Sequence, residues 1–128
     1  YTDLFNQINE INDKVLNFYD TCDFDKDHKV LIEKLTMIKI KISNKELIHC
    51  IAFAYSLIGY KQKDNKLALL QYFVSIFFLP KYLSSLYNIL MISKKTKNFS
   101  YFEYLKNNSN FEETFQKMFI KKYNKDFL

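Results

Sequence analysis

The sequence has almost none of the residues that break helices or build tight turns. Its 128 residues include one glycine, Gly59, and one proline, Pro80. A β-sandwich or barrel needs Gly and Pro at many of its turns, and a parallel α/β fold needs tight strand–helix turns. A chain with 48% hydrophobic residues can nevertheless bury a core. We therefore predict an all-α fold, a single compact helical domain over residues 1–128 with about six to seven helices.

Arginine is absent, so all 19 basic residues are lysines, and the formal net charge is +5. Because Arg is the preferred side chain for bidentate contacts to bases and phosphates, we expect no sequence-specific binding of nucleic acid. The abundance of Lys, Asn, Ile, Phe and Tyr is typical of an AT-rich genome, which accounts for the basic charge. The alternative is a weak attraction to an anionic partner.

Long hydrophobic runs and a cysteine framework are also missing. The most apolar stretch, residues 67–79, is interrupted by Gln71 and Ser75 and is too short to span a bilayer, so we expect no transmembrane segment. The two cysteines, Cys22 and Cys50, are expected to be free thiols of an intracellular, cytoplasmic protein. A disulfide between them, in an oxidising compartment, is the alternative.

Helical periodicity and polar breaks predict where the helices lie. Apolar residues recur at steps of three and four over residues 2–22, and a second short helix follows a charged break at residues 20–29. Ser43 and Glu46 form a capping box for a helix that ends near Gly59, and Ser109 and Glu112 form another for a helix over residues 111–125. Between them we predict a central buried helix over 67–79, a helix over 81–92 that Pro80 begins, a basic loop at 93–98 and a short helix over 99–105. The alternation of Ile and Lys at residues 39–42 leaves a brief strand open.

Residue patterns that support catalysis are missing. The sequence has no Ser–His–Asp or Cys–His signature and no paired carboxylate motif, and a single glycine cannot build a phosphate-binding loop. The two histidines, His28 and His49, and the two cysteines are too scattered to match the spacing of a metal site. We therefore predict no catalytic residues and no metal or other cofactor.

One segment carries a motif with a known mechanism. Asp23, Asp25 and Asp27 match the first, third and fifth positions of a calcium-binding loop, and Val30 and Leu35 match its apolar positions. The first fifty residues thus resemble an EF-hand. The sequence departs from the pattern at two positions: His28 stands where the loop needs Gly, and Lys34 where it needs Glu. We expect calcium binding to be weak at most.

The resemblance is to degenerate EF-hand proteins of the calmodulin-like type, such as the myosin light chains of malaria parasites and other apicomplexans. It implies helix–loop–helix pairs in two lobes, residues 1–78 and 79–128, that clamp an amphipathic helix of a partner protein largely independently of calcium. The side chains expected to line the partner-binding groove are aromatic residues and Met: Phe77, Phe78, Met91, Tyr101, Phe102, Met118 and Phe119.

Two other readings remain open. One is a helical-repeat scaffold, because the small and aromatic residues of two segments match a tetratricopeptide repeat with about four extra residues in its turn. They are Ile48, Ile51, Ala52, Tyr55 and Gly59, followed by Ala68, Tyr72, Ser75 and Pro80. The other is an orphan helical interaction domain of a parasite or virus.

Overall fold

The computed structural model describes residues 2–120, and side chains over residues 3–118. Within this part of the chain there are seven α-helices and one 3₁₀ helix, and no β-strand. They are α1 (Thr2–Thr21), α2 (Phe24–Ile40), α3 (Lys45–Lys61), α4 (Asn65–Phe78), α5 (Leu83–Thr96), α6 (Ser100–Lys106), η1 (Ser109–Phe111) and α7 (Glu112–Ile120). The prediction of an all-α domain is therefore confirmed.

Short polar side chains determine where three of the helices begin. Asp23, Asn44 and Asp64 are the N-caps of α2, α3 and α4. Each side-chain oxygen accepts a hydrogen bond from the backbone N–H two residues later, at 3.3, 2.9 and 2.9 Å. The capping box predicted at Ser43 is therefore displaced by one residue, because the amide of Asn44 makes this bond instead.

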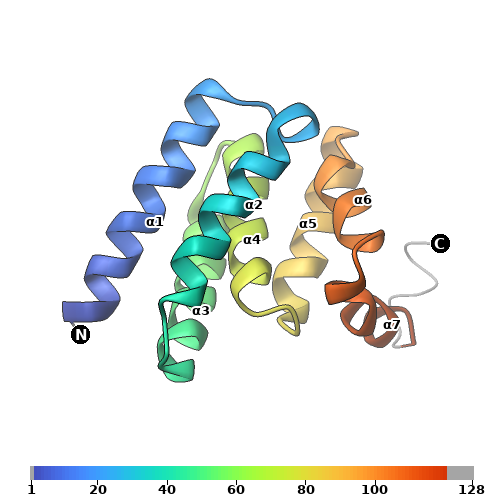
Figure 1. The fold of residues 1–128 in the computed structure, drawn as a ribbon. Coiled ribbons are helices and arrows are strands. Elements are labelled where there is room, and N and C mark those ends of the chain that lie inside the picture. Colours follow the sequence, from blue (N-terminus) through green and yellow to red (C-terminus); the bar gives the residue numbers. More distant parts are fainter. Residues whose placement is uncertain (1, 121–128) are drawn as a thin grey trace.

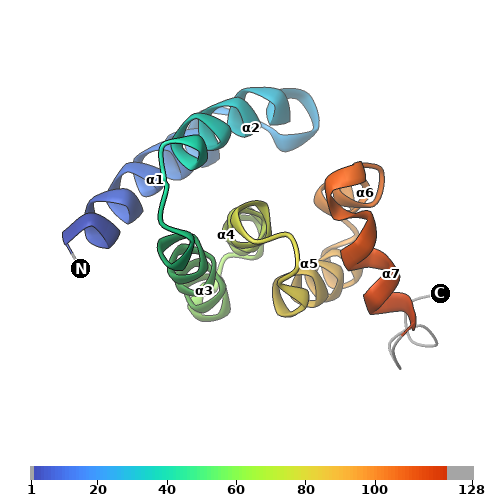
Figure 2. The same cartoon turned by 60° about the horizontal axis from the view of Figure 1, so that its bottom comes forward.

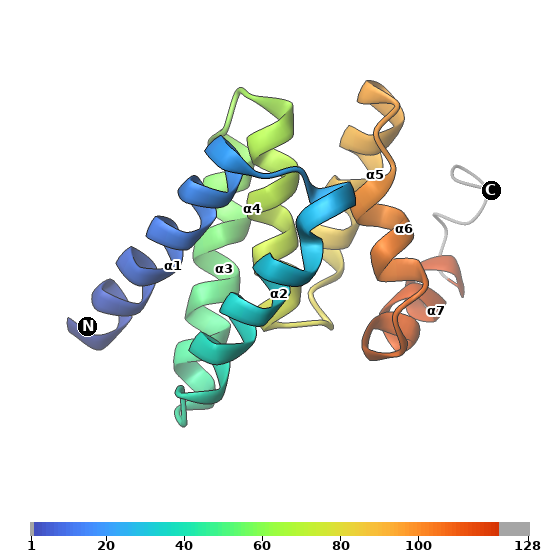
Figure 3. The same cartoon turned by 45° about the horizontal axis from the view of Figure 1, so that its top comes forward.

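The helices lie as antiparallel pairs around a central row. The turn at residues 22–23 folds α2 back along α1, and α3, α4 and α5 run up, down and up beside one another (Figure 1). Seen from the end of these helices, α1 and α2 cover the row at α3 and α4, while α6 covers it at α5 (Figure 2). As a result α2 and α6 lie on the same side of α4 (Figure 3).

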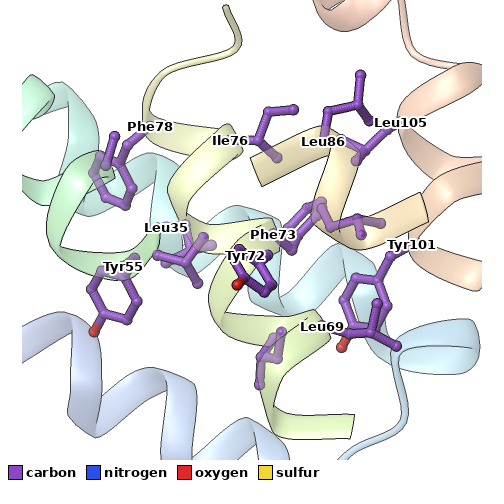
Figure 4. Packing of buried hydrophobic residues seen from close by; sticks show 14 of the residues in the cluster. Leu35, Tyr55, Leu69, Tyr72, Phe73, Ile76, Phe78, Leu86, Tyr101 and Leu105 are labelled. Carbon is purple, nitrogen blue, oxygen red and sulfur yellow. The ribbon is translucent and has the colours of Figure 1, made fainter. Parts of the chain in front are cut away.

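Helix α4 occupies the centre of the core, as its apolar sequence predicts. Every residue from Ala68 to Phe78 is buried except Phe77, which is partly buried. The other helices turn one apolar face toward α4 and toward each other (Figure 4). Their most deeply buried side chains are Ile11, Val15, Leu31, Leu35, Ile51, Tyr55, Leu86, Ile89 and Leu105. The buried hydrophobic residues form one core cluster, which includes residues before and after position 78. The two lobes predicted from the sequence, residues 1–78 and 79–128, therefore contribute to the same core.

Small residues allow α3, α4 and α5 to pack closely. The buried Ser75 hydroxyl donates to the carbonyl oxygen of Ala52 at 2.7 Å, and it lies 2.7 Å from the Ser85 hydroxyl. Further along the pair, a Cβ on Gly59 would lie 3.1 Å from three atoms of the Tyr72 ring. The absence of a side chain at position 59 therefore lets the Tyr72 ring lie across α3.

Two regions differ from the prediction. Pro80 does not begin α5, because residues 79–82 form a turn and the helix starts at Leu83. At its other end α5 continues to Thr96, so most of the basic loop expected at residues 93–98 is helical. Lys97, the C-cap of α5, adopts the left-handed conformation (φ 62°). Glycine usually occupies such a position at the end of a helix, but in this chain it is a lysine. The last helix is described over Glu112–Ile120, and residues 121–125 of its predicted range lie outside the described residues.

Candidate functional site

The acidic segment that resembles a calcium loop forms the start of a helix in the structure. The helix α2 begins at Phe24, so residues 24–34 are helical where a calcium loop would curl around an ion. Asp23 is the N-cap, and a carboxylate oxygen of Asp27 accepts a hydrogen bond from the backbone N–H of Asp23 at 2.9 Å. Asp25 and Asp27 lie in the first turn, where the helix dipole favours negative charge. The expectation of a loop at this place is therefore wrong, because Asp at alternate positions before an apolar run also serves as an N-terminal helix signal.

Replacing Asp23 by alanine is expected to lower the free energy of unfolding by about 1 kcal/mol, the usual cost of losing an N-cap. Asp20→Ala is the matched control, since Asp20 is exposed near the C-terminal end of α1, where a negative charge gains nothing from the dipole. Urea denaturation measures both variants. Equal losses in the two variants would contradict the capping role, as would stabilisation of the native chain by millimolar calcium.

The seven side chains expected to form one partner groove lie in different environments. Phe78, Tyr101, Phe102 and Met118 are buried in the core, so in this structure they do not face a partner. Met91 is exposed on α5 and is separate from them. The side chain of Phe119 lies outside the described residues. Phe77, which is partly buried, lines a cleft.

The first cleft lies between the N-terminal half of α2 and α6. It has a volume of about 290 Å³. Its walls are Phe24, Asp25 and His28 from α2, and Ser100, Glu103, Tyr104, Asn107 and Asn108 from α6 and the turn after it. The rings of His28 and Tyr104 are 5.4 Å apart between centroids, and Phe24 lies within 5.9 Å of both. Asp25 and Glu103, which are both exposed, also line it. This end of the site therefore combines aromatic rings with two carboxylates.

The second cleft, of about 450 Å³, continues along α2 toward the C-terminal end of α4. Its walls are Ile32, Thr36, Lys39, Phe77, Pro80, Tyr104, Asn110 and Phe111. Tyr104 lines both clefts, so the two adjoin at this ring. We call the two clefts together the α2–α6 groove.

Lys39 gives this end of the groove a positive charge. Its ammonium donates a hydrogen bond to the carbonyl oxygen of Phe77 at 3.1 Å and lies 5.5 Å from the centroid of the Phe77 ring. That carbonyl belongs to the last turn of α4, whose carbonyls lack helical partners and carry the negative end of the dipole. Partial burial lowers the pKa of Lys39 from its ordinary value. The residues that line this cleft include no carboxylate.

The Tyr104 ring at the junction of the two clefts is held on both sides. Asn108 donates a hydrogen bond from its side-chain amide to the Tyr104 hydroxyl at 3.0 Å. The ring packs edge-on against Phe73 of α4, with the centroids 5.9 Å apart. Burial raises the pKa of Tyr104, and the bond from Asn108 partly offsets this rise. Tyr104 therefore separates the negative end of the groove from the positive end without adding a charge of its own.

Comparison of the chain with models of known protein families, with curated proteins and with solved structures gives no significant match.

The groove includes residues that sequence reasoning did not select. Asp25, His28, Ile32, Thr36 and Lys39 follow one another at steps of three or four, so they share one face of α2. That signal is present in the sequence, but it is recognisable only if a helix starts at residue 24. The expectation of a loop over the same residues concealed it.

A second apolar surface lies on the outer side of α3. Phe53, Leu57 and Tyr60 are 53%, 45% and 77% exposed and recur at helical spacing. Cys50, one turn before Phe53, is exposed. Both Cys50 and the partly buried Cys22 are free thiols. Phe53, Leu57 and Tyr60 line neither of the two clefts of the α2–α6 groove.

Within the described residues, no group of three or more His, Cys, Asp or Glu side chains is placed to hold a metal ion. None of the helices described has the length and apolar character needed to cross a membrane.

Proposed function

We propose that this chain is a non-catalytic binding domain that holds an amphipathic helix of a partner protein in the α2–α6 groove. The observation that carries the proposal is the groove itself, which follows α2 from Asp25 to Lys39. Aromatic side chains line it, and its charged groups are at its two ends. Apolar clefts with a few placed polar groups are the usual form of binding sites.

The shape and the walls of the groove favour a helical partner. Asp25 and Lys39 are 14 residues apart, which corresponds to about 21 Å along a helix. A partner helix laid in such a groove presents side chains at steps of three and four, which match the spacing of the residues that line α2. Extended peptides commonly bind by adding a strand to a sheet edge, and the part of the chain that the structure describes has no sheet. Calcium has no part in this mode of binding.

Filling the groove is expected to abolish binding. A library of 16-residue helical peptides is selected for binding to the chain, and the affinity of the best peptide is then measured by calorimetry. Thr36→Trp should weaken it at least tenfold, because Thr36 lines the cleft and an indole would occupy the space. Lys34→Trp adds the same ring to an exposed position of α2 outside the groove and should leave the affinity within about twofold.

If both Trp variants bind the peptide as tightly as the native chain, the groove is not the binding site and the proposal is wrong. The thermal midpoint of each variant, measured by circular dichroism, separates a loss of binding from a loss of folding.

A helical-repeat scaffold is the second candidate, and one observation favours it. The residues that matched a repeat in the sequence form an antiparallel pair in which the Ser75 hydroxyl bonds to the backbone of Ala52. The pairs α1–α2, α3–α4 and α5–α6 follow one another along the chain (Figure 1). A scaffold of this kind would use the outer face of α3, so binding would be lost on Phe53→Ala and Leu57→Ala and retained in Thr36→Trp.

A further inference from the structure

We infer that the helix held in the α2–α6 groove carries an acidic side chain at its N-terminal end and a basic side chain at its C-terminal end, and that it docks antiparallel to α2. This inference rests on the proposed function, because it specifies the chemistry and the direction of the helix at the same site.

The acidic side chain is assigned to the end of the groove at Lys39. The Lys39 side chain is partly buried, and within the described residues its ammonium has one hydrogen-bond acceptor, the carbonyl oxygen of Phe77. An ammonium has three donors, so two remain for a ligand. None of the residues that line this cleft is acidic. A partly desolvated charge without an opposite charge is costly, and a carboxylate from the partner would relieve that cost.

Thr36, which has a hydroxyl, and Asn110, which has a side-chain amide, line the same cleft. Both can donate to a carboxylate, as Lys39 does, while Phe77 and Phe111 offer apolar contact to the stem of the side chain. This donor set is suited to Asp or Glu.

The basic side chain is assigned to the opposite end. Asp25 of α2 and Glu103 of α6 are exposed residues that line the first cleft, and Phe24 and Tyr104 form part of its wall. An ammonium or guanidinium that enters this cleft can pair with a carboxylate and lie against an aromatic ring. The two ends of the groove therefore have opposite charge, and a docked helix must match both.

The direction follows from the dipole of the partner helix. Acidic side chains stabilise a helix near its N-terminus and basic side chains near its C-terminus. A partner helix with its acidic residue near the N-terminus and its basic residue near the C-terminus therefore places its N-terminus at Lys39 and its C-terminus at Asp25. Since α2 runs from Asp25 to Lys39, the docked helix runs antiparallel to it, and its two charged residues are separated by about 11 to 14 positions.

The test uses a 16-residue peptide selected for binding to the native chain, with its charges placed in two ways. In one peptide Glu is near the N-terminus and Lys near the C-terminus, and in the other the two residues are exchanged. We expect the first to bind at least tenfold more tightly by calorimetry. A double-mutant cycle then assigns the acidic contact: Glu→Gln in the peptide should weaken binding to the native chain about tenfold and to Lys39→Gln less than twofold.

The outcomes separate the two proposals. Suppose that Thr36→Trp blocks binding, but the peptide with exchanged charges binds as tightly as the first peptide or more tightly. This inference is then overturned, while the groove remains the binding site. If the peptide Glu→Gln change has the same effect with and without Lys39, the assignment of the carboxylate to Lys39 is overturned. The comparison of the two charge arrangements uses the native protein alone, so it remains valid even if Lys39→Gln folds poorly. If no selected peptide responds to Thr36→Trp, the proposed function itself fails.

Discussion

Replacing Phe73 by alanine is expected to lower the free energy of unfolding by about 3–5 kcal/mol, the range seen when a buried Phe is truncated to Ala. Phe73 is fully buried near the middle of α4 (Figure 4). Its ring contacts Phe24 of α2 and Tyr101 of α6, with centroids 5.1 and 5.6 Å away. The substitution therefore removes contacts to both helices that form the walls of the groove, and it leaves a cavity between them.

Urea denaturation monitored by circular dichroism measures this loss, and a native stability of about 5–15 kcal/mol leaves a measurable transition in most of that range. Phe53→Ala is the control, since Phe53 is 53% exposed on α3 and should cost less than about 0.5 kcal/mol. If Phe73→Ala fails to fold, Phe73→Leu should still fold, with a smaller loss. A loss below about 1 kcal/mol for Phe73→Ala would contradict the placement of this ring.

Raising the pH above 10 is expected to destabilise the chain steeply, because two buried tyrosines must ionise when it unfolds. Burial raises the pKa of Tyr55 and of Tyr101 well above the ordinary value of 10.0. Below pH 10 both phenols are neutral in the folded and unfolded chain, so their contribution is fully present. Above pH 10 the unfolded chain loses these protons while the folded chain keeps them, so stability falls by about 1.4 kcal/mol per pH unit for each tyrosine.

The lowered pKa of Lys39 acts in the opposite direction: stability rises between that lowered pKa and 10.5, where the folded chain has lost this proton and the unfolded chain keeps it. Lys39 is a single, partly buried group, so its effect is smaller than that of the two tyrosines. Tyr55→Phe and Tyr101→Phe should each reduce the slope of stability against pH, and the double variant should reduce it further. The raised pKa values of Tyr19, Tyr72 and Tyr104 leave part of the slope in the double variant. Tyr55→Phe also removes the hydrogen bond from its hydroxyl to Asn12, which costs about 1 kcal/mol at neutral pH. Tyr60→Phe, at an exposed position, is the control. A slope that is the same in the native chain and the double variant would show that these two phenols are not the buried groups.

The core of this fold could be predicted from the sequence because its signals are local. The apolar run at residues 67–79 corresponds to α4, and the three- and four-residue steps near the N-terminus correspond to α1. The charged break before α2 leads to the wrong prediction of a loop, because Asp23 and its neighbours fit a calcium loop and a helix cap equally well in sequence. Only the register of the following apolar residues distinguishes the two, and Leu31, Leu35 and Ile38 continue the helix from residue 24.

The candidate site could be predicted only in part. Residue type predicts which aromatic residues are candidates, but it does not distinguish a ring in the core from a ring in a cleft. Phe78 is buried, whereas its neighbour Phe77 lines the groove. Lys39 carries no sequence signal of its own among 19 lysines. It acquires its properties because α2 ends beside the last turn of α4, a packing relation between residues 38 positions apart.

The most direct test of the groove is a nuclear magnetic resonance titration of the uniformly ¹⁵N-labelled chain with the selected 16-residue peptide. The amide shifts should change along the groove face of α2, from Asp25 to Lys39, and along α6 and η1, with the largest changes near Tyr104. Amides of the outer face of α3, around Phe53 and Leu57, should be unaffected. Shifts confined to that face of α3, with α2 and α6 unchanged, would contradict the account.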